Sequence, residues 1–521
     1  MVRLFGHCYF FLLFHYVSAL SDISSSLGPV INLGYAAYVG NSTTPTGESN
    51  GPITFFGGIA YAQPPVGDLR FRAPKPLSEG IPINNTVPIV DARDWGPPCI
   101  QSPAETPAGF PLFDWVEQSE RPIVGVSIAY RLNLLGFLAG DSLDPEDKNA
   151  GLQDQRLALE WVQRHITQFG GDPEQVTIAG ESAGGASVVM HMVAFGGTKP
   201  ALFKRVIAQS IGYGPMATDE QANNAFERVV SIVGCPDPGQ GALSCLRSAS
   251  VGAISSAINR AGPFSPVVDG PNGFFPALPG TLFASGNFST VEFIGGHCTN
   301  DGRTFVGGDP SDFVTDADVI ERVFARFSTL TNATIERALS LYPEPGAPGS
   351  PFTSQYDRAS TMAQELIFGC MDWFIADQLQ KRGVRDIFTY RFNSPNPVLL
   401  SQNPFQGVMH TSDLFYLFSG NTRQPNAGFT FTPFNQTEAA LSKESVAFWT
   451  SFISSGNPST HRLPSSSAWP PFQYNTRMVL TQAKEANLSI STASGEEVTP
   501  RDEIQRCMFW MNVNTTQQTR I

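Results

Sequence analysis

Residues 175–190 read QVTIAGESAGGASVVM, and this stretch decides the fold class. Residues 175–179 are rich in β-branched side chains, which is typical of a strand buried on both faces. A glycine-rich turn follows at 180–185, and the apolar run 186–195 has the character of a helix. A strand, a sharp turn and a helix in this order predict a parallel sheet with helices packed on it.

The flanking segments repeat this alternation. Residues 122–130 form a continuous β-branched run that predicts a second buried strand. Residues 151–169 carry apolar side chains at helical spacing, and Gly and Pro at 170–173 end that helix. A further strand is predicted at 206–209, and no linker composition follows. We therefore expect a single α/β domain over residues 20–521, built on a central, mostly parallel sheet flanked by helices.

Composition excludes several classes of function. The chain has 521 residues, of which 41% are hydrophobic and 15% charged, so it is globular rather than disordered. Its net charge is −13 and it has no long basic run, which argues against nucleic acid and anionic lipid as partners. After the N-terminal segment, no stretch is apolar enough to predict a membrane span.

The N-terminal segment predicts secretion. Arg3 precedes an apolar stretch at 8–17, and the small residues Val17-Ser18-Ala19 form a cleavage pattern, so residues 1–19 are expected to be a signal peptide. Glycosylation of the secreted chain is consistent with seven Asn-x-Ser/Thr sequons, at Asn41, Asn84, Asn287, Asn332, Asn435, Asn487 and Asn514.

The cysteines fit an oxidising compartment. Six remain once residues 1–19 are removed, and the short loop between Cys235 and Cys245 makes these two the easiest pair to close. No Cys-x-x-Cys pair occurs, so neither a zinc site nor any other metal site is expected.

The motif Gly180-x-Ser182-x-Gly184 is the candidate for catalysis. On its own the pattern is common, but here it joins a predicted strand to a predicted helix, where a nucleophile elbow belongs. Such a turn lifts the Ser182 hydroxyl above the sheet and directs the helix N-terminus at a developing oxyanion. The sequence thus predicts a serine nucleophile.

A serine hydroxyl needs a base, and in this architecture the acid and then the histidine follow the serine along the chain. His410 and His461 are the two candidates. His461 lies in a polar loop next to Pro464, which is typical of solvated surface, whereas His410 follows a turn and precedes an apolar run. For the acid, Asp301 follows a strand-like stretch at the expected carboxyl edge of the sheet, and Asp269 competes with it.

These segments resemble the type-B carboxylesterase/lipase family of α/β-hydrolases, which includes cholinesterases and large microbial lipases. Long matches lie at 55–76, 149–185 and 266–270 and around His410. The resemblance implies the α/β-hydrolase fold and hydrolysis of small-molecule or lipid esters without any cofactor.

The resemblance also assigns roles to residues. Ser182 is the nucleophile, His410 the base and Asp301 the acid, where the family usually has Glu. The Ala183 amide is an oxyanion donor and Asp269 belongs to a structural motif. Cys235 and Cys245 match a family disulfide.

One family segment is missing. Between the equivalents of Cys99 and Pro122, the family has a Glu-Asp-Cys segment and a strand that ends in a His-Gly-Gly-Gly loop. This chain has no Gly-Gly pair from Asp91 to Arg121. We therefore expect an internal deletion between residues 99 and 121, which removes the other oxyanion donors and an inner strand. In the family this strand lies between the strands predicted here at 122–130 and 175–179. Cys99 loses its family partner, and each lost donor costs about 10²–10³ in kcat.

Three interpretations compete. The first is a secreted serine esterase or lipase whose sequence lacks a few tens of residues through a gene-model or splicing error. The second is a catalytically inactive, adhesion-type relative, and the third is an unrelated binding protein. The first is favoured because Ser182, Asp301 and His410 are all retained.

Overall fold

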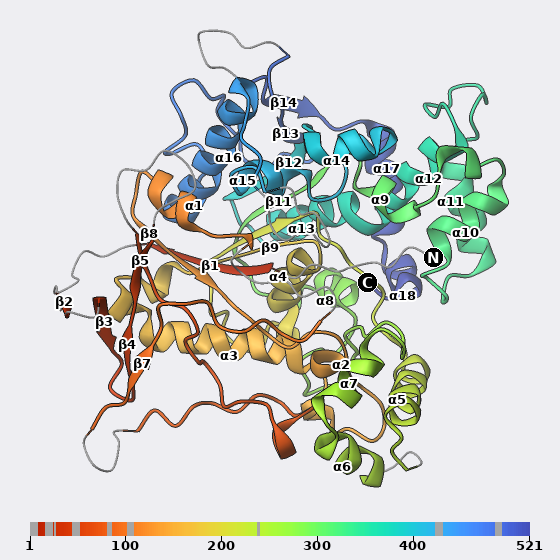
Figure 1. Ribbon diagram of the computed structural model, residues 1–521. Coiled ribbons are helices and arrows are strands. Elements are labelled where there is room, and N and C mark those ends of the chain that lie inside the picture. The colour runs from red at the N-terminus through yellow and green to blue at the C-terminus, as the bar shows by residue number, and fades with distance from the viewer. Residues whose placement is uncertain are drawn as a thin grey trace.

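The computed structural model describes residues 9–15, 24–25, 28–43, 53–80, 86–101, 109–236, 240–421, 431–484 and 492–521. Within them the chain forms an eight-stranded sheet with helices on both faces (Figure 1). The predicted α/β architecture is confirmed. The expected cleavage pattern Val17-Ser18-Ala19 and the sequons at Asn84 and Asn487 lie outside the described residues.

The central sheet is mixed. Its strands from β9 to β13 run parallel to one another, whereas β14 and β1 pair antiparallel with their neighbours. In spatial order the strands are β14 (Gly495–Val498), β13 (Thr476–Leu480), β12 (Ile387–Phe392), β11 (Glu292–Cys298), β10 (Arg205–Gln209), β9 (Thr177–Glu181), β1 (Tyr9–His15) and β8 (Ile123–Ser127).

Strand β1 occupies the position where the sequence predicts a missing inner strand. It lies between β8 and β9, with Leu12 opposite Val126 on one side and Ile178 on the other. Its sequence, YFFLLFH, consists mostly of aromatic and aliphatic residues, which favour strands. A segment expected to leave with the signal peptide therefore pairs with the two strands that would otherwise lack a neighbour.

The sheet is buried on both faces. Along β10, Val206 and Ala208 join one apolar core, and Ile207 between them joins the other. Helices α3 (Ala150–His165), α4 (Ala183–Val193) and α13 (Cys370–Lys381) cover the first face, and α1 (Phe113–Gln118), α15 (Ser412–Leu417) and α16 (Gln436–Ser455) cover the second. Successive strand residues point to opposite faces, so burial on both explains the continuous apolar runs.

Smaller elements surround this sandwich. Two short sheets near the N-terminus contain β2 (Ser24–Ser25), β3 (Gly28–Asn32), β4 (Ala37–Val39) and β7 (Ile89–Asp91), and β5 (Asn41–Thr43) with β6 (Ile53–Phe55). The other helices are α2 (Asn133–Phe137), α5 (Asp219–Val233), α6 (Gln240–Ser248), α7 (Val251–Ile258), α8 (Pro279–Ser285), α9 (Asp301–Val306), α10 (Asp316–Phe324), α11 (Asn332–Leu341), α12 (Gln355–Gln364), α14 (Pro397–Gln402), α17 (Arg501–Trp510) and α18 (Val513–Thr519). In the described part of the chain, no helix has the length and apolar character that crossing a membrane requires.

Several boundaries differ from the predicted ones, and two of them lie at 3₁₀ turns. The helix predicted at 151–169 ends at His165, and a 3₁₀ turn continues it as far as Gly170, whose φ is 83°. The strand predicted at 175–179 begins at Thr177 because Pro173–Gln175 forms another 3₁₀ turn, which the Asp172 carboxylate caps.

Candidate active site

Ser182 stands at the turn between β9 and α4. Its backbone has φ 59° and ψ −120°, a strained conformation for a residue with a side chain. The turn is held from both sides, since the Ser182 amide donates to the Gln209 carbonyl at 2.9 Å and the Gly212 amide donates to the Ser182 carbonyl at 3.0 Å. A Cβ at Gly185 would lie 2.6 Å from that same Gln209 oxygen. The small residues around Ser182 thus allow the close packing that a nucleophile elbow requires.

His410 comes to Ser182 from a loop far along the chain. Its Nε2 lies 2.8 Å from Ser182 Oγ, and its Nδ1 lies 2.6 Å from Asp301 Oδ1. The loop turns sharply after His410, where Thr411 has φ 73° before α15 begins. The structure therefore brings together the serine, histidine and acid that the sequence singled out.

Asp301 is the first residue of α9, directly beyond the end of β11. Its second carboxylate oxygen accepts hydrogen bonds from the Cys298 amide and from Ser210 Oγ, each at 2.9 Å. With both oxygens engaged, the carboxylate has a fixed orientation toward His410. Asp301 is fully buried, and Ser182 and His410 are only 7% and 8% exposed, so bulk water has little access to the bonds between them.

The competing candidates lie elsewhere. Asp269 accepts hydrogen bonds from Asn149 Nδ2 and from the amides of Phe274 and Phe275, and these bonds tie two loops together. Burial raises the pKa of Asp269 above its ordinary value. His461 pairs with Glu120 at 3.1 Å, and that glutamate is 66% exposed. These partners of Asp269 and His461 do not include Ser182 or His410.

Glu181, the residue before the serine, is a further charged neighbour of His410 that the sequence does not predict. Its Oε1 lies 3.2 Å from His410 Nε2, and the side chain is 2% exposed. A second carboxylate therefore faces the imidazole on the side of Ser182, where it favours positive charge on the ring. Its place inside the Gly-x-Ser-x-Gly motif was the only signal available.

Another acid is buried beneath this group. Asp413 accepts a hydrogen bond from Gln209 Nε2 at 2.7 Å, and Tyr390 Oη and Cys298 Sγ lie 3.4 and 3.7 Å from its carboxylate. Complete burial, with the Asp301 carboxylate as a smaller contribution, raises the pKa of Asp413 above its usual range. This network packs under the loop that carries His410.

The first helical amide after the serine belongs to Ala183, the predicted oxyanion donor. The first four amides of a helix have no acceptor within the helix, so this end of α4 presents donors and a partial positive charge.

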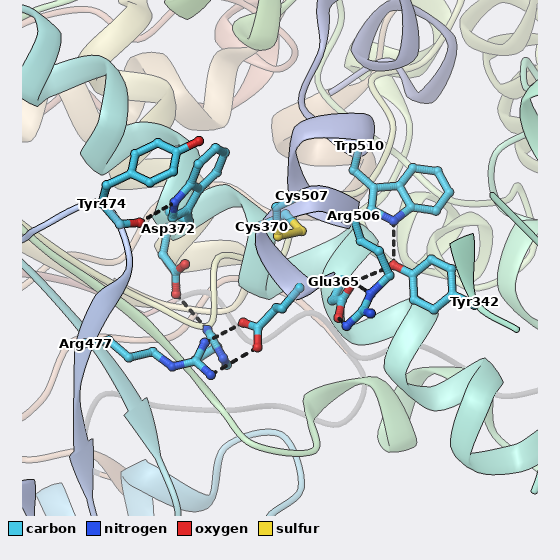
Figure 2. Close-up of a disulfide and its surroundings, with 12 residues drawn as sticks. Tyr342, Glu365, Cys370, Asp372, Tyr474, Arg477, Arg506, Cys507 and Trp510 are labelled. Atoms are coloured by element: carbon cyan, nitrogen blue, oxygen red, sulfur yellow. Dashed lines mark hydrogen bonds and ion pairs between the residues drawn. A yellow bond between two sulfur atoms is a disulfide. The ribbon is translucent and has the colours of Figure 1, made fainter. Parts of the chain in front are cut away.

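Two disulfides lie within the described residues. Cys235 and Cys245 are joined, as the sequence predicts. A second bridge, between Cys370 and Cys507, links α13 to α17 and is shown in Figure 2. Among the described residues, Cys99 and Cys298 are free thiols, and Cys99 Sγ accepts the Leu132 amide at 3.3 Å.

Known proteins share both the sequence and this fold. The model of the carboxylesterase family matches residues 28–120 and 116–510. Secreted lipase 4 of Gibberella zeae is 27% identical, with 92% of each chain covered. Lipase 1 of Geotrichum candidum is 29% identical over 77% of this chain and 87% of its own. The crystal structure of Aspergillus niger EstA superimposes with a TM-score of 0.78 at 27% identity, covering 95% of this chain and 100% of its own.

Two of these relatives are named as lipases, and the family match extends over most of the chain on both sides of the nucleophile turn. The resemblance drawn from the sequence is thereby confirmed, and the chain belongs to the carboxylesterase family.

Proposed function

We propose that this protein is a secreted serine carboxylesterase or lipase that hydrolyses carboxylic esters through an acyl-Ser182 intermediate. The observation that carries the proposal is the continuous hydrogen-bonded chain from Ser182 Oγ through His410 to Asp301, with contacts of 2.8 and 2.6 Å. These distances match the reach that a nucleophile and its general base require.

The reaction follows from this geometry. His410 Nε2 takes the proton of Ser182 Oγ as that oxygen bonds to the ester carbonyl carbon, and Asp301 stabilises the resulting imidazolium. The imidazolium then gives its proton to the departing alkoxide, which leaves as an alcohol while Ser182 stays acylated. A water molecule attacks the acyl carbon with His410 again as base, and the return of the proton to Ser182 Oγ releases the carboxylic acid.

The oxyanion of each tetrahedral intermediate needs donors, and Ala183 supplies one. We propose that a segment supplying the others is missing from this sequence between Cys99 and Arg121. Two observations support this. The family model matches in two stretches that meet at residues 116–120. The alignment with secreted lipase 4 extends over 549 positions, more than the 521 residues of this chain.

A catalytically inactive, adhesion-type relative is the second candidate, and the absence of the Gly-Gly loop favours it. The two candidates make different predictions about Ser182. An inactive relative has no need of a base aligned on a serine, whereas an esterase requires the proton relay that the three residues form.

Secretion and glycosylation belong to the same proposal. Residues 1–19 have the pattern of a signal peptide, and two disulfides suit an oxidising compartment. Relatives that are named secreted lipases support this route. Sequon asparagines with exposed side chains are available for glycans, at Asn41, Asn287, Asn332, Asn435 and Asn514.

A fluorophosphonate probe tests the proposal, because it forms a stable adduct only with an activated serine. We expect labelling at Ser182 in the chain with a restored segment and no labelling after Ser182→Ala. The chain with the restored segment should also hydrolyse p-nitrophenyl esters, and a series of acyl-chain lengths reports its acyl preference. Labelling at another residue, or full esterase activity in Ser182→Ala, would show that the assignment is wrong. If Ser182 is labelled neither in the chain without the restored segment nor in the chain with it, the second candidate, an inactive relative, is supported.

A further inference from the structure

A single π-helical turn lies between the candidate triad and the C-terminal helices. Residues Glu365–Gly369 form this turn, η8, between α12 and α13, and all five are buried. Such turns are rare within helices and redirect side chains by one position. Here the turn presents one side to His410 and α9 and the other side to α17.

On the side of the base, Phe368 packs against the His410 ring. The two ring centroids are 4.9 Å apart at an interplanar angle of 40°. Phe305 contacts the same imidazole edge-on at 5.0 Å, and the two phenyl rings touch each other at 4.8 Å. Phe368 is 1% exposed, so it cannot move aside without opening the core. The imidazole is therefore held by contacts with two aromatic rings as well as by its hydrogen bonds.

On the side of the acid, α12 is packed directly against α9, which begins at Asp301. Gln364 Oε1 accepts the amide of Gly302, the next residue along, at 2.9 Å. A Cβ at Gly302 would lie 2.0 Å from the Ser360 carbonyl, so only glycine permits this approach. The residues immediately before and within the π turn thus contact both α9, which begins at the acid, and the base.

The opposite side of the turn is fastened to α17. The Glu365 carboxylate receives two hydrogen bonds from Arg506, at 2.7 and 2.6 Å, and one from Tyr342 Oη at 2.6 Å. Trp510 Nε1 donates to the same Tyr342 oxygen at 2.8 Å. The Cys370–Cys507 bridge lies beside these contacts, as Figure 2 shows. Bidentate pairing fixes the angle as well as the distance between the two elements.

We propose that Phe368 is a positioning residue for His410, and that the Glu365–Arg506 pair holds the π turn so that Phe368 keeps its place. This inference rests on the proposed catalytic role of His410. Loss of the phenyl ring leaves the imidazole with its two hydrogen bonds but with room to rotate. A small rotation moves Nε2 out of line with Ser182 Oγ, which lowers the rate of proton transfer while leaving substrate binding unchanged.

The test separates positioning from stability. Fluorophosphonate titration counts competent Ser182 sites, and the rate of p-nitrophenyl ester hydrolysis is then expressed per titrated site. We expect Phe368→Leu to lower kcat per site about 10-fold with KM unchanged. Phe226→Leu is the matched control, because Phe226 is equally buried, at 2% exposure, in a separate core cluster around α5 and α6. That variant should lose thermal stability and keep its rate per site.

Two further variants keep the test decisive if Phe368→Leu does not fold. Phe368→Met retains most of the volume without the ring, and Arg506→Lys keeps the charge but loses the bidentate fork. Both should lower kcat per site in the same direction. Rates per site within twofold of the parent chain in all variants would overturn the positioning role alone. The parent chain in this test carries the restored segment between Cys99 and Arg121. If it fails to react at Ser182, the proposed function and this inference are both overturned.

Discussion

Removal of residues 1–19 tests the sheet position that β1 fills. The structure places Tyr9–His15 between β8 and β9, yet the sequence of residues 1–19 predicts a cleaved signal peptide. If cleavage occurs and no other strand takes this position, β8 and β9 lose their common neighbour. We expect a chain that begins at residue 20 to be unable to fold.

The magnitude follows from the register. Strand β1 is aligned with five residues of β8 and with five of β9. In an antiparallel ladder, about half of the residues on each neighbour direct both backbone groups at the shared strand, so roughly ten N–H and C=O groups lose their partners. At ~1–3 kcal/mol for each buried unsatisfied group, the cost reaches at least ~10 kcal/mol. This is as large as the ~5–15 kcal/mol that stabilises a typical domain.

The assay compares four chains, each exported by the same foreign leader. Residues 1–19 are present or absent, and a strand-and-loop segment from a relative is inserted between Cys99 and Arg121 or omitted. We expect aggregation only of the chain that lacks both. Deletion of residues 1–8 alone, which leaves β1 intact, is the control. Size-exclusion chromatography and thermal melting report the result, and a monomeric, cooperatively melting chain without either segment would refute the reasoning.

Four other predictions follow from the site and its surroundings. Asp301→Asn should lower kcat by about 10³–10⁴-fold, because the imidazolium loses its stabilising carboxylate, whereas Asp269→Asn should mainly lower the melting temperature; a larger loss of kcat in Asp269→Asn would reverse the assignment of the acid. Burial lowers the pKa of His191 to about 3, so the unfolded chain binds a proton that the folded chain does not, and stability should fall as pH drops from 6.5 toward 3 by up to about 1.4 kcal/mol per pH unit. Thermal melts of His191→Gln should show a weaker dependence over that interval, and an unchanged slope would count against this explanation. Peptide mapping of the non-reduced protein should recover Cys235 linked to Cys245 and Cys370 linked to Cys507, with alkylation of any of the four contradicting the pairing. Genomic DNA or a full-length transcript should encode a further in-frame segment between Cys99 and Arg121 that contains a cysteine and a glycine-rich turn, and a continuous coding sequence without it would remove the case for an error.

The parts of the site that depend on local sequence were predictable. The elbow at Ser182 follows from a strand, a tight turn and a helix that are contiguous in the chain. His410 and Asp301 could be chosen because the fold constrains their order along the chain and because their loops follow turn signals. The continuous apolar runs likewise predicted a sheet covered by helices on both faces. A strand buried on both faces does not alternate apolar and polar residues.

Contacts between distant segments were not predictable in this way. The Cys370–Cys507 bridge joins residues 137 apart, and no spacing rule favours that pair over Cys298 or Cys99. The π turn at Glu365–Gly369 depends on packing against α17 and on His410, neither of which is local. For residues 9–15 the sequence itself is ambiguous, because the same short apolar run suits a leader peptide and a buried strand.

The three aligned side chains lie far apart in the sequence, so they are synthesised at different times. Ser182 precedes His410 by 228 residues, and Asp301 precedes it by 109. At a translation speed of roughly 5–20 residues per second, the ribosome delivers the base some 10 to 45 seconds after the serine. If His410 is the base that we propose, the emerging polypeptide carries an ordinary serine hydroxyl throughout that interval, and so does any product truncated before residue 410.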